Sequence, residues 1–121
     1  ASDGDWLFYI GRSYNDRWLI DRQLNGNVCE ARIWDVARTQ QEIWKNMYDI
    51  EDPENEAHLA AYWKFNEGSS NDIKDYSKYH NDAHIVRYWK DFNSKEEYDV
   101  KNEELWPSGI EVPQVNREDW K

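Results

Sequence analysis

The 121-residue sequence predicts an all-β protein of antiparallel strands with one short amphipathic helix inserted among them. Three observations indicate this class: runs of alternating apolar and polar residues, turn-forming residues between the runs, and a single helix start signal. The alternation is clearest over residues 59–66, whose apolar positions are Leu59, Ala61, Trp63 and Phe65. A strand with one buried face has this pattern, because successive side chains point to opposite faces of a sheet.

The segments before this strand predict further strands joined by turns. Residues 6–10 form an aromatic and β-branched run, which favours a strand. Residues 13–16 have turn chemistry, and residues 17–20 are expected to form the returning strand. A second turn is centred on the Asn-Gly pair at 25–26, and residues 29–33 then alternate apolar and charged side chains.

The helix is predicted over residues 40–49. Residues 39–42 read Thr-Gln-Gln-Glu, a capping box in which the threonine hydroxyl accepts from the glutamate amide and the glutamate carboxylate accepts from the threonine amide. Ile43 and Met47 lie one turn apart, so we expect them to pack the helix on the sheet. Pro53 is expected to end the helix, since proline disfavours helical geometry in the residue before it.

After residue 66 the pattern weakens. Residues 68–72 predict a loop and residues 83–89 a strand, which completes a folded body at residues 1–89. The charged remainder, residues 90–121, has two prolines and spaced apolar residues, so we interpret it as an extended C-terminal tail or strap, with an interaction arm as the alternative. Its expected anchors are Trp106, Ile110, Val112, Val115 and Trp120.

Five segments, in this order, resemble the laminin-G-like, concanavalin-A-like jelly-roll family of secreted and surface bacterial proteins. They are residues 8–12, 24–35, 37–43, 59–68 and 75–83, which read FYIGR, LNGNVCEARIWD, ARTQQEI, LAAYWKFNEG and DYSKYHNDA. The resemblance implies an antiparallel β-sandwich of the jelly-roll type, an extracellular or cell-surface location, and lectin-like or adhesion roles. The family normally has an acidic residue where Cys29 stands, and often leucine where Arg38 stands.

The resembling segments correspond to the later part of such a domain. A jelly roll has about eight strands, whereas five or six are predicted here, and nothing before residue 6 resembles the opening strands. We therefore expect an incomplete jelly roll that relies on missing strands of its own domain or on a second copy. Bare sheet edges and apolar inner faces are otherwise unstable in water.

Charge and composition restrict the partners. The chain has 15 Lys and Arg against 25 Asp and Glu, a net charge of −10 at pH 7. This charge repels phosphate, so nucleic acid and anionic membranes are poor candidates, and a neutral glycan is favoured over a sulfated one. No stretch approaches the roughly 20 apolar residues of a membrane span. The single cysteine, Cys29, cannot form an internal disulfide and is expected to be a small buried residue.

No arrangement in the sequence predicts catalysis. Glycoside hydrolases need two acids at a fixed separation, but the densest acidic cluster, residues 51–56, is interrupted by Pro53 and predicts a solvated loop. Glu30 is expected to share a strand with Arg32 and to be an ion-pair or cross-strand partner rather than a catalytic acid. We therefore expect no enzymatic activity, with a glycoside hydrolase accessory fragment as the less favoured interpretation.

The one cofactor candidate is calcium. Asp72, Asp75 and Asp82 could supply the oxygen ligands that this ion prefers. The alternative, which we favour, is that these acids occupy turns, where their side chains bond to nearby backbone groups. His80 and His84 lack the helical spacing of a zinc pair, and no other cofactor is implied.

Aromatic residues beside a polar turn supply the predicted binding site. Tyr14 and Trp18 flank Asn15 and Asp16, and Trp89 ends a strand as a second platform. A flat ring can cover the apolar face of a pyranose while amides and acids bond its hydroxyl groups. The alternative is that these rings cover the rim of the sandwich. The core is expected to hold Trp34, Trp44, Trp63 and Phe65.

These observations predict a non-catalytic carbohydrate-binding module of a secreted or surface-exposed bacterial protein, with a neutral glycan as its ligand. The alternative is a structural or protein–protein interaction domain with an adhesion role. The expected partner is a carbohydrate or another protein domain, and neither nucleic acid binding nor membrane insertion is expected.

Overall fold

The computed structural model describes residues 8–11, 13–14, 20–21, 24, 26–85, 89–91, 96–97 and 101–111. The chain divides into two compact units. The first comprises residues 1–27 and 87–99, and the second comprises residues 28–86 and 100–121. Each unit therefore combines segments from both sides of residue 89, where the sequence suggests a boundary.

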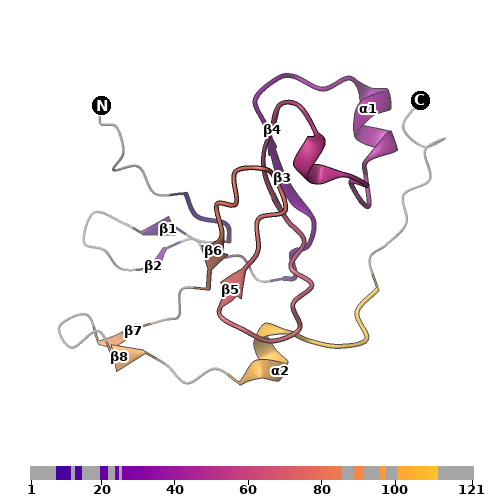
Figure 1. The fold of residues 1–121 in the computed structure, drawn as a ribbon. Coiled ribbons are helices and arrows are strands. Elements are labelled where there is room, and N and C mark those ends of the chain that lie inside the picture. The colour runs from indigo at the N-terminus through magenta and orange to yellow at the C-terminus, as the bar shows by residue number, and fades with distance from the viewer. Residues whose placement is uncertain are drawn as a thin grey trace, which may run out of the picture. The chain divides into compact units, whose positions relative to one another are not determined.

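The described part of the chain is rich in short antiparallel strands, as predicted (Figure 1). In chain order they are β1 Ser13–Tyr14, β2 Ile20–Asp21, β3 Ala31–Trp34, β4 Leu59–Trp63, β5 Asp72–Ile73, β6 Ala83–His84, β7 Trp89–Asp91 and β8 Glu96–Glu97. They form four two-stranded sheets, β1–β2, β3–β4, β5–β6 and β7–β8. β6 covers only the first two residues of the strand predicted over 83–89, and β7 begins at its last residue.

In the first unit, the hairpin β1–β2 begins inside the segment that was predicted to be a turn. Residues 8–10, predicted to be a strand, form none. Phe8 and Ile10 are exposed there, and an apolar run becomes a strand only where it packs against neighbouring strands. Gly11 has a φ of +95°, which glycine tolerates, and its carbonyl accepts from the Leu24 N–H at 2.6 Å.

The centre of the second unit is the β3–β4 ribbon. Its strands occupy the two segments in which the sequence alternates most clearly, so those predictions are confirmed. The pairs on the apolar face are Ala31 with Trp63 and Ile33 with Ala61. Arg32 pairs with Tyr62 on the opposite face.

Two small apolar clusters pack on this ribbon. The first contains Ile50, Leu59 and Tyr62, with Trp34 and Tyr76 partly buried against it. The second is built on Ala61, Trp63 and Ile73, and its partly buried members are Ala31, Ile33, Phe65, Ala83, Ile85 and Trp106. The predicted core residues Trp34, Trp63 and Phe65 thus lie in or against the clusters.

The outer edge of β4 is closed by the loop that follows β5. Tyr62 N–H donates to Asp75 Oδ1 at 2.9 Å, and Tyr76 N–H donates to the Tyr62 carbonyl at 2.8 Å. Ser77 Oγ lies 3.4 Å from the Ala60 carbonyl oxygen. An edge covered in this way does not offer its backbone groups to another chain.

Three short helices complete the described part of the chain: α1 Gln40–Lys45, the 3-10 helix η2 Pro53–Asn55, and α2 Asn102–Leu105. The predicted capping box at the start of α1 is confirmed. Thr39 Oγ1 accepts from the Glu42 N–H at 3.2 Å, and the Thr39 N–H donates to Glu42 Oε1 at 2.9 Å.

The predicted end of this helix is wrong, because α1 ends at Lys45 rather than at residue 49. The Met47 carbonyl accepts from Arg32 Nη1 at 3.3 Å instead of continuing the helix. Pro53 opens η2 and does not end α1. The prediction that Ile43 packs α1 on the sheet is also wrong, since its side chain is 47% exposed. A helix of six residues has fewer than two turns and cannot carry the longer apolar stripe.

Cys29 is exposed, contrary to the expectation that it is buried. The cause lies in the next residue, because Glu30 has a left-handed φ of +54°. β3 therefore begins only at Ala31, and its pleat does not extend back to the cysteine.

α2 attaches the first part of the C-terminal segment to the second unit. Trp106 packs against the second cluster, and its Nε1 donates to the Ser70 carbonyl at 3.2 Å. Asn102 Nδ2 donates to the Gly68 carbonyl at 3.3 Å. Trp106 is therefore an anchor, as the strap interpretation predicts, whereas Ile110 is exposed. The other predicted anchors, Val112, Val115 and Trp120, lie outside the described residues.

Candidate ligand-binding groove

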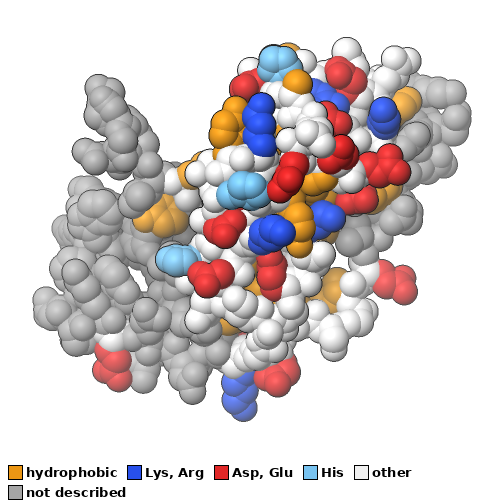
Figure 2. Space-filling view, viewed as in Figure 1, with side chains coloured by type: hydrophobic (Ala, Val, Ile, Leu, Met, Phe, Trp, Pro, Cys, Tyr) orange, Lys and Arg blue, Asp and Glu red, His pale blue; other side chains and the backbone are white. Residues whose placement is uncertain are grey.

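A groove of about 250 Å³ lies between β3 and α1 in the second unit. It is lined by Glu30, Arg32, Trp34, Arg38, Glu42, Ile43 and Asn46. Three of these are alternate residues in and just before β3, and such residues share a face of a strand. Glu42 and Ile43 of α1 lie about one turn before its C-cap, Asn46. On the face of the molecule that Figure 2 shows, acidic and basic side chains are likewise interspersed.

Arg38 is held between an aromatic ring and a carboxylate. Its Cζ lies 3.5 Å from the centroid of the Trp34 ring, and its side chain is only 11% exposed. Its Nε lies 3.5 Å from Glu42 Oε2, which is an ion pair without a hydrogen bond. The indole face attracts the guanidinium, so Arg38 is oriented before any ligand binds.

Glu42 belongs to the capping box of α1 and also lines the groove. Hydrogen bonds from the Thr39 backbone and side chain, followed by the charge of Arg38, lower the pKa of the Glu42 carboxyl. The carboxylate is therefore ionised at neutral pH, and one of its oxygens faces Arg38.

Arg32 and Glu30 form the second charged pair of the groove. Arg32 Nη2 lies 2.7 Å from Glu30 Oε1, which confirms the predicted ion pair. The left-handed backbone of Glu30 costs a non-glycine residue roughly 1–2 kcal/mol. Strained backbone of this kind gathers at functional sites, so Glu30 is a candidate functional residue on geometry as well as charge.

The Tyr62 hydroxyl joins the groove to a second acid. Tyr62 is fully buried, and its hydroxyl donates to Glu30 Oε1 at 2.6 Å. The Tyr62 hydroxyl oxygen also lies 3.2 Å from Asp49 Oδ1. This contact is the weaker of the two, because a phenol has a single proton to donate. Burial and the hydrogen bond to Glu30 raise the pKa of Tyr62 well above its ordinary value, so the phenol remains a donor.

Lys64 neutralises this second acid. Its Nζ lies 3.4 Å from Asp49 Oδ1 and 4.8 Å from the centroid of the Tyr76 ring. Desolvation alone would raise the pKa of Asp49, but the Lys64 charge and the hydrogen bonds from Lys64 and Tyr62 outweigh it and lower that pKa. Asp49 is therefore an acceptor at neutral pH and is not poised to donate a proton.

The convergence of Glu30 and Asp49 on one phenol is a feature that sequence reasoning missed. One acid precedes β3 and the other follows α1, so no regular spacing relates them. The one available signal was Tyr62, a polar ring at a position opposite the apolar residues of its strand. Chemically, the groove and this network present fixed donors and acceptors of balanced charge, which suits a polar, uncharged ligand.

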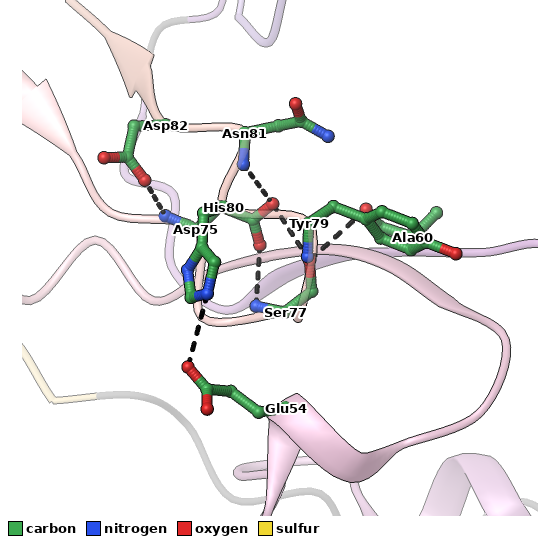
Figure 3. Close-up of polar contacts among 8 residues, drawn as sticks. All are labelled: Glu54, Ala60, Asp75, Ser77, Tyr79, His80, Asn81 and Asp82. Atoms are coloured by element: carbon green, nitrogen blue, oxygen red, sulfur yellow. Dashed lines mark hydrogen bonds and ion pairs between the residues drawn. The ribbon is translucent and has the colours of Figure 1, made fainter.

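A separate polar cluster surrounds Asp75, which is fully buried together with Ser77 (Figure 3). Asp75 Oδ1 accepts from the N–H groups of Tyr62 and Ser77 at 2.9 and 2.8 Å. Oδ2 accepts from the Asn81 N–H at 2.8 Å and from the Ser77 hydroxyl at 3.0 Å. Burial opposes ionisation, but these donors outweigh it and lower the pKa of Asp75. Four hydrogen bonds fill the acceptor capacity of a carboxylate, so Asp75 has a structural role.

The other calcium candidates also have internal partners. Asp82 Oδ1 accepts from the Asp75 N–H at 2.9 Å, and Asp72 Oδ1 lies 3.3 Å from His84 Nδ1. Asp82 bonds to a nearby backbone group, as an acid in a turn does, whereas Asp72 lies in β5 and contacts its cross-strand partner His84. Within the described ranges, no three His, Cys, Asp or Glu side chains gather in a way that could hold a metal ion.

The predicted sugar-stacking residues lie outside what the structure describes. Asn15, Asp16 and Trp18 are not among the described residues. Tyr14 and Trp89 belong to β1 and β7, but their side chains are not described. That site therefore stays a prediction.

No protein-family model matches the chain, and no curated protein or solved structure matches it. None of the helices in the described segments combines the length and the apolar character that crossing a membrane requires.

Proposed function

We propose that this chain is a non-catalytic carbohydrate-binding module of a secreted or surface-exposed bacterial protein, and that it binds a neutral glycan in the groove between β3 and α1. The groove itself carries the proposal. Its two guanidinium groups and two carboxylates are paired before binding and balance in charge, and one amide lines the groove beside them. Sugar hydroxyls both donate and accept, so they can satisfy such a lining without bringing a charge. A polyanion would instead meet Glu30 and Glu42.

The proposal includes an incomplete jelly roll of the concanavalin-A-like type as the parent fold. Its support is that the described strands pair antiparallel and that α1 lies between β3 and β4 in chain order. Missing strands or a second copy would cover apolar side chains that are exposed among the described residues, such as Phe8, Ile10 and Leu24.

The first hairpin is a second proposed sugar contact. Tyr14, Asn15, Asp16 and Trp18, with Trp89 as a further platform, combine rings with polar groups in the way that pyranose recognition needs. This contact is independent of the groove and needs its own variants.

The alternative function is a structural or protein–protein interaction domain. One observation favours it: Val36 and Ile43 are both more than two-fifths exposed, and Ile43 lines the groove. Apolar side chains at the border of a polar site are typical of protein interfaces.

A glycan array of the full chain tests the proposal, with Asn46→Ala as the groove variant and Trp18→Ala and Tyr14→Ala as the hairpin variants. Lys45→Ala is the control, because this exposed residue of α1 does not line the groove. Loss of binding in Asn46→Ala alone supports the groove, and loss in the hairpin variants alone moves the site to the hairpin. Absence of binding to every neutral glycan rejects the module in favour of the interaction domain, and glycan turnover by the wild type rejects the non-catalytic assignment.

A further inference from the structure

Arg38 is the least satisfied charged group of the groove. Its Nε is buried and makes no hydrogen bond, and its nearest anion is Glu42 Oε2 at 3.5 Å. Charge-assisted hydrogen bonds of this kind are ordinarily about 2.7–2.9 Å long. Arg32 also has a buried Nε without a hydrogen bond, but its Nη1 donates to the Met47 carbonyl at 3.3 Å and its Nη2 donates to Glu30 Oε1 at 2.7 Å. Arg38 and Glu42 therefore face each other as donor and acceptor without closing a hydrogen bond.

Neither group is free to close this gap. The Arg38 guanidinium lies over the Trp34 ring, which itself packs against the first apolar cluster. Glu42 has its other oxygen, Oε1, bonded to the Thr39 N–H at 2.9 Å in the capping box. The sequence that starts α1 thus also fixes the separation between the two charges.

We infer that the Arg38–Glu42 pair recognises adjacent hydroxyl groups of a single neutral pyranose at the end of a glycan. One hydroxyl accepts from the guanidinium and its neighbour donates to the carboxylate, so both charges are satisfied and the groove remains balanced. A carboxylate or phosphate ligand would be attracted by the Arg38 charge but repelled by the charges of Glu42 and Glu30. This inference rests on the proposed function and names its ligand class.

The size of the groove favours a single ring, which in this inference is the terminal one. Its volume of about 250 Å³ is below the roughly 300–1,000 Å³ of pockets that enclose drug-sized molecules. Trp34 cannot stack on the sugar while Arg38 covers its ring, so Trp34 is a positioning residue for Arg38. Recognition therefore depends on hydrogen bonds to hydroxyl groups rather than on ring stacking.

Calorimetric titration of the full chain with methyl hexopyranosides, their 2-deoxy counterparts and the matching methyl hexuronides tests this inference. At least one methyl hexopyranoside should bind, and losing a hydroxyl or gaining a carboxylate should weaken binding about tenfold, the equivalent of one hydrogen bond to a charged group. Binding of a hexuronide more tightly than of the hexopyranoside would overturn the inference.

Two variants test the pair itself. Glu42→Gln keeps the capping box, since glutamine also serves at that position, but removes the charged acceptor, and Arg38→Leu removes the donor. Each should weaken binding about tenfold. The affinity of Lys45→Ala should equal that of the wild type, and the circular dichroism spectrum of Glu42→Gln should match the wild-type spectrum. Unchanged affinity in Glu42→Gln and Arg38→Leu overturns the inference but leaves the proposed function standing. If glycan polymers bind on the array but no methyl hexopyranoside binds, the assignment of a terminal ring as the ligand is rejected, and the other claims are unaffected.

Discussion

Replacing Asp75 with asparagine should destabilise the fold by about 3 kcal/mol. Asparagine retains one oxygen, which can still accept from the Tyr62 and Ser77 N–H groups. It places an amide NH₂ where Oδ2 now accepts from the Asn81 N–H and the Ser77 hydroxyl. The hydroxyl can turn to the Ala60 carbonyl, 3.4 Å away, but the backbone N–H of Asn81 cannot turn.

The size of the expected destabilisation follows from the two hydrogen bonds that Oδ2 no longer accepts. A hydrogen bond to a charged group contributes roughly 1.5–3 kcal/mol, and a donor left without a partner costs roughly 1–3 kcal/mol. The expected loss is a large share of the 5–15 kcal/mol that typically separates a folded domain from its unfolded state. It is concentrated at the edge of β4, where the Asp75 loop is bonded to the strand.

Urea denaturation followed by tryptophan fluorescence measures this loss. Asp82→Asn is the matched control, because one carbonyl oxygen suffices to accept from the Asp75 N–H, and it should change stability by less than about 1 kcal/mol. If Asp75→Asn does not fold, Ser77→Ala removes a single hydrogen bond to the same carboxylate and should cost about 2 kcal/mol. Equal effects of Asp75→Asn and Asp82→Asn would refute the reasoning.

The pH dependence gives a second test of the same carboxylate. The folded state lowers the pKa of Asp75, so its contribution to stability is complete above the unfolded value of roughly 3.9 and is lost as pH falls through the folded value. The stability difference between wild type and Asp75→Asn should therefore shrink as the pH is lowered below about 4. A difference that stays constant down to acid unfolding would contradict an ionised Asp75.

Three other expectations concern the helix, the phenol and the parent fold. Thr39→Ala should cost about 1 kcal/mol in thermal unfolding by loss of the cap, whereas Thr39→Ser should cost almost nothing. The folded state raises the pKa of Tyr62, so the wild type should lose stability above about pH 10 more steeply than Tyr62→Phe in alkaline urea titrations. Sedimentation velocity should show self-association that increases with concentration, and a stable monomer at every concentration would contradict the incomplete jelly roll.

Local sequence patterns predicted the β3–β4 ribbon and the start of α1 well. The alternation in both strands and the capping box at Thr39 depend on residues within a few positions of one another, so spacing alone reveals them. The Glu30–Arg32 ion pair was predicted from alternation along one strand, and the pair forms although Glu30 lies just before β3.

The errors arose where a distant contact decides the conformation. α1 was expected to continue past residue 45, but Arg32 bonds to the Met47 carbonyl from another strand. Cys29 was expected to be buried, but the left-handed backbone of Glu30 ends the pleat beside it. The meeting of Glu30 with Asp49 at Tyr62 requires three separate elements, so no spacing in the sequence could have revealed it.

Glu42 connects the most predictable local feature of the chain with its candidate site. In the capping box the Glu42 carboxylate accepts from the Thr39 N–H, so this role depends only on a residue three positions away. Through the oxygen that faces Arg38 it is also the acceptor of the groove. Because Gln at this position would preserve the cap and remove the charge, helix formation alone does not require Glu42 to be an acid. A carboxylate suits Arg38, because Glu42 Oε2 lies 3.5 Å from the Arg38 Nε, which is buried and makes no hydrogen bond. The ion pair between Arg38 and Glu42 thus links the residue that starts α1 to the lining of the groove.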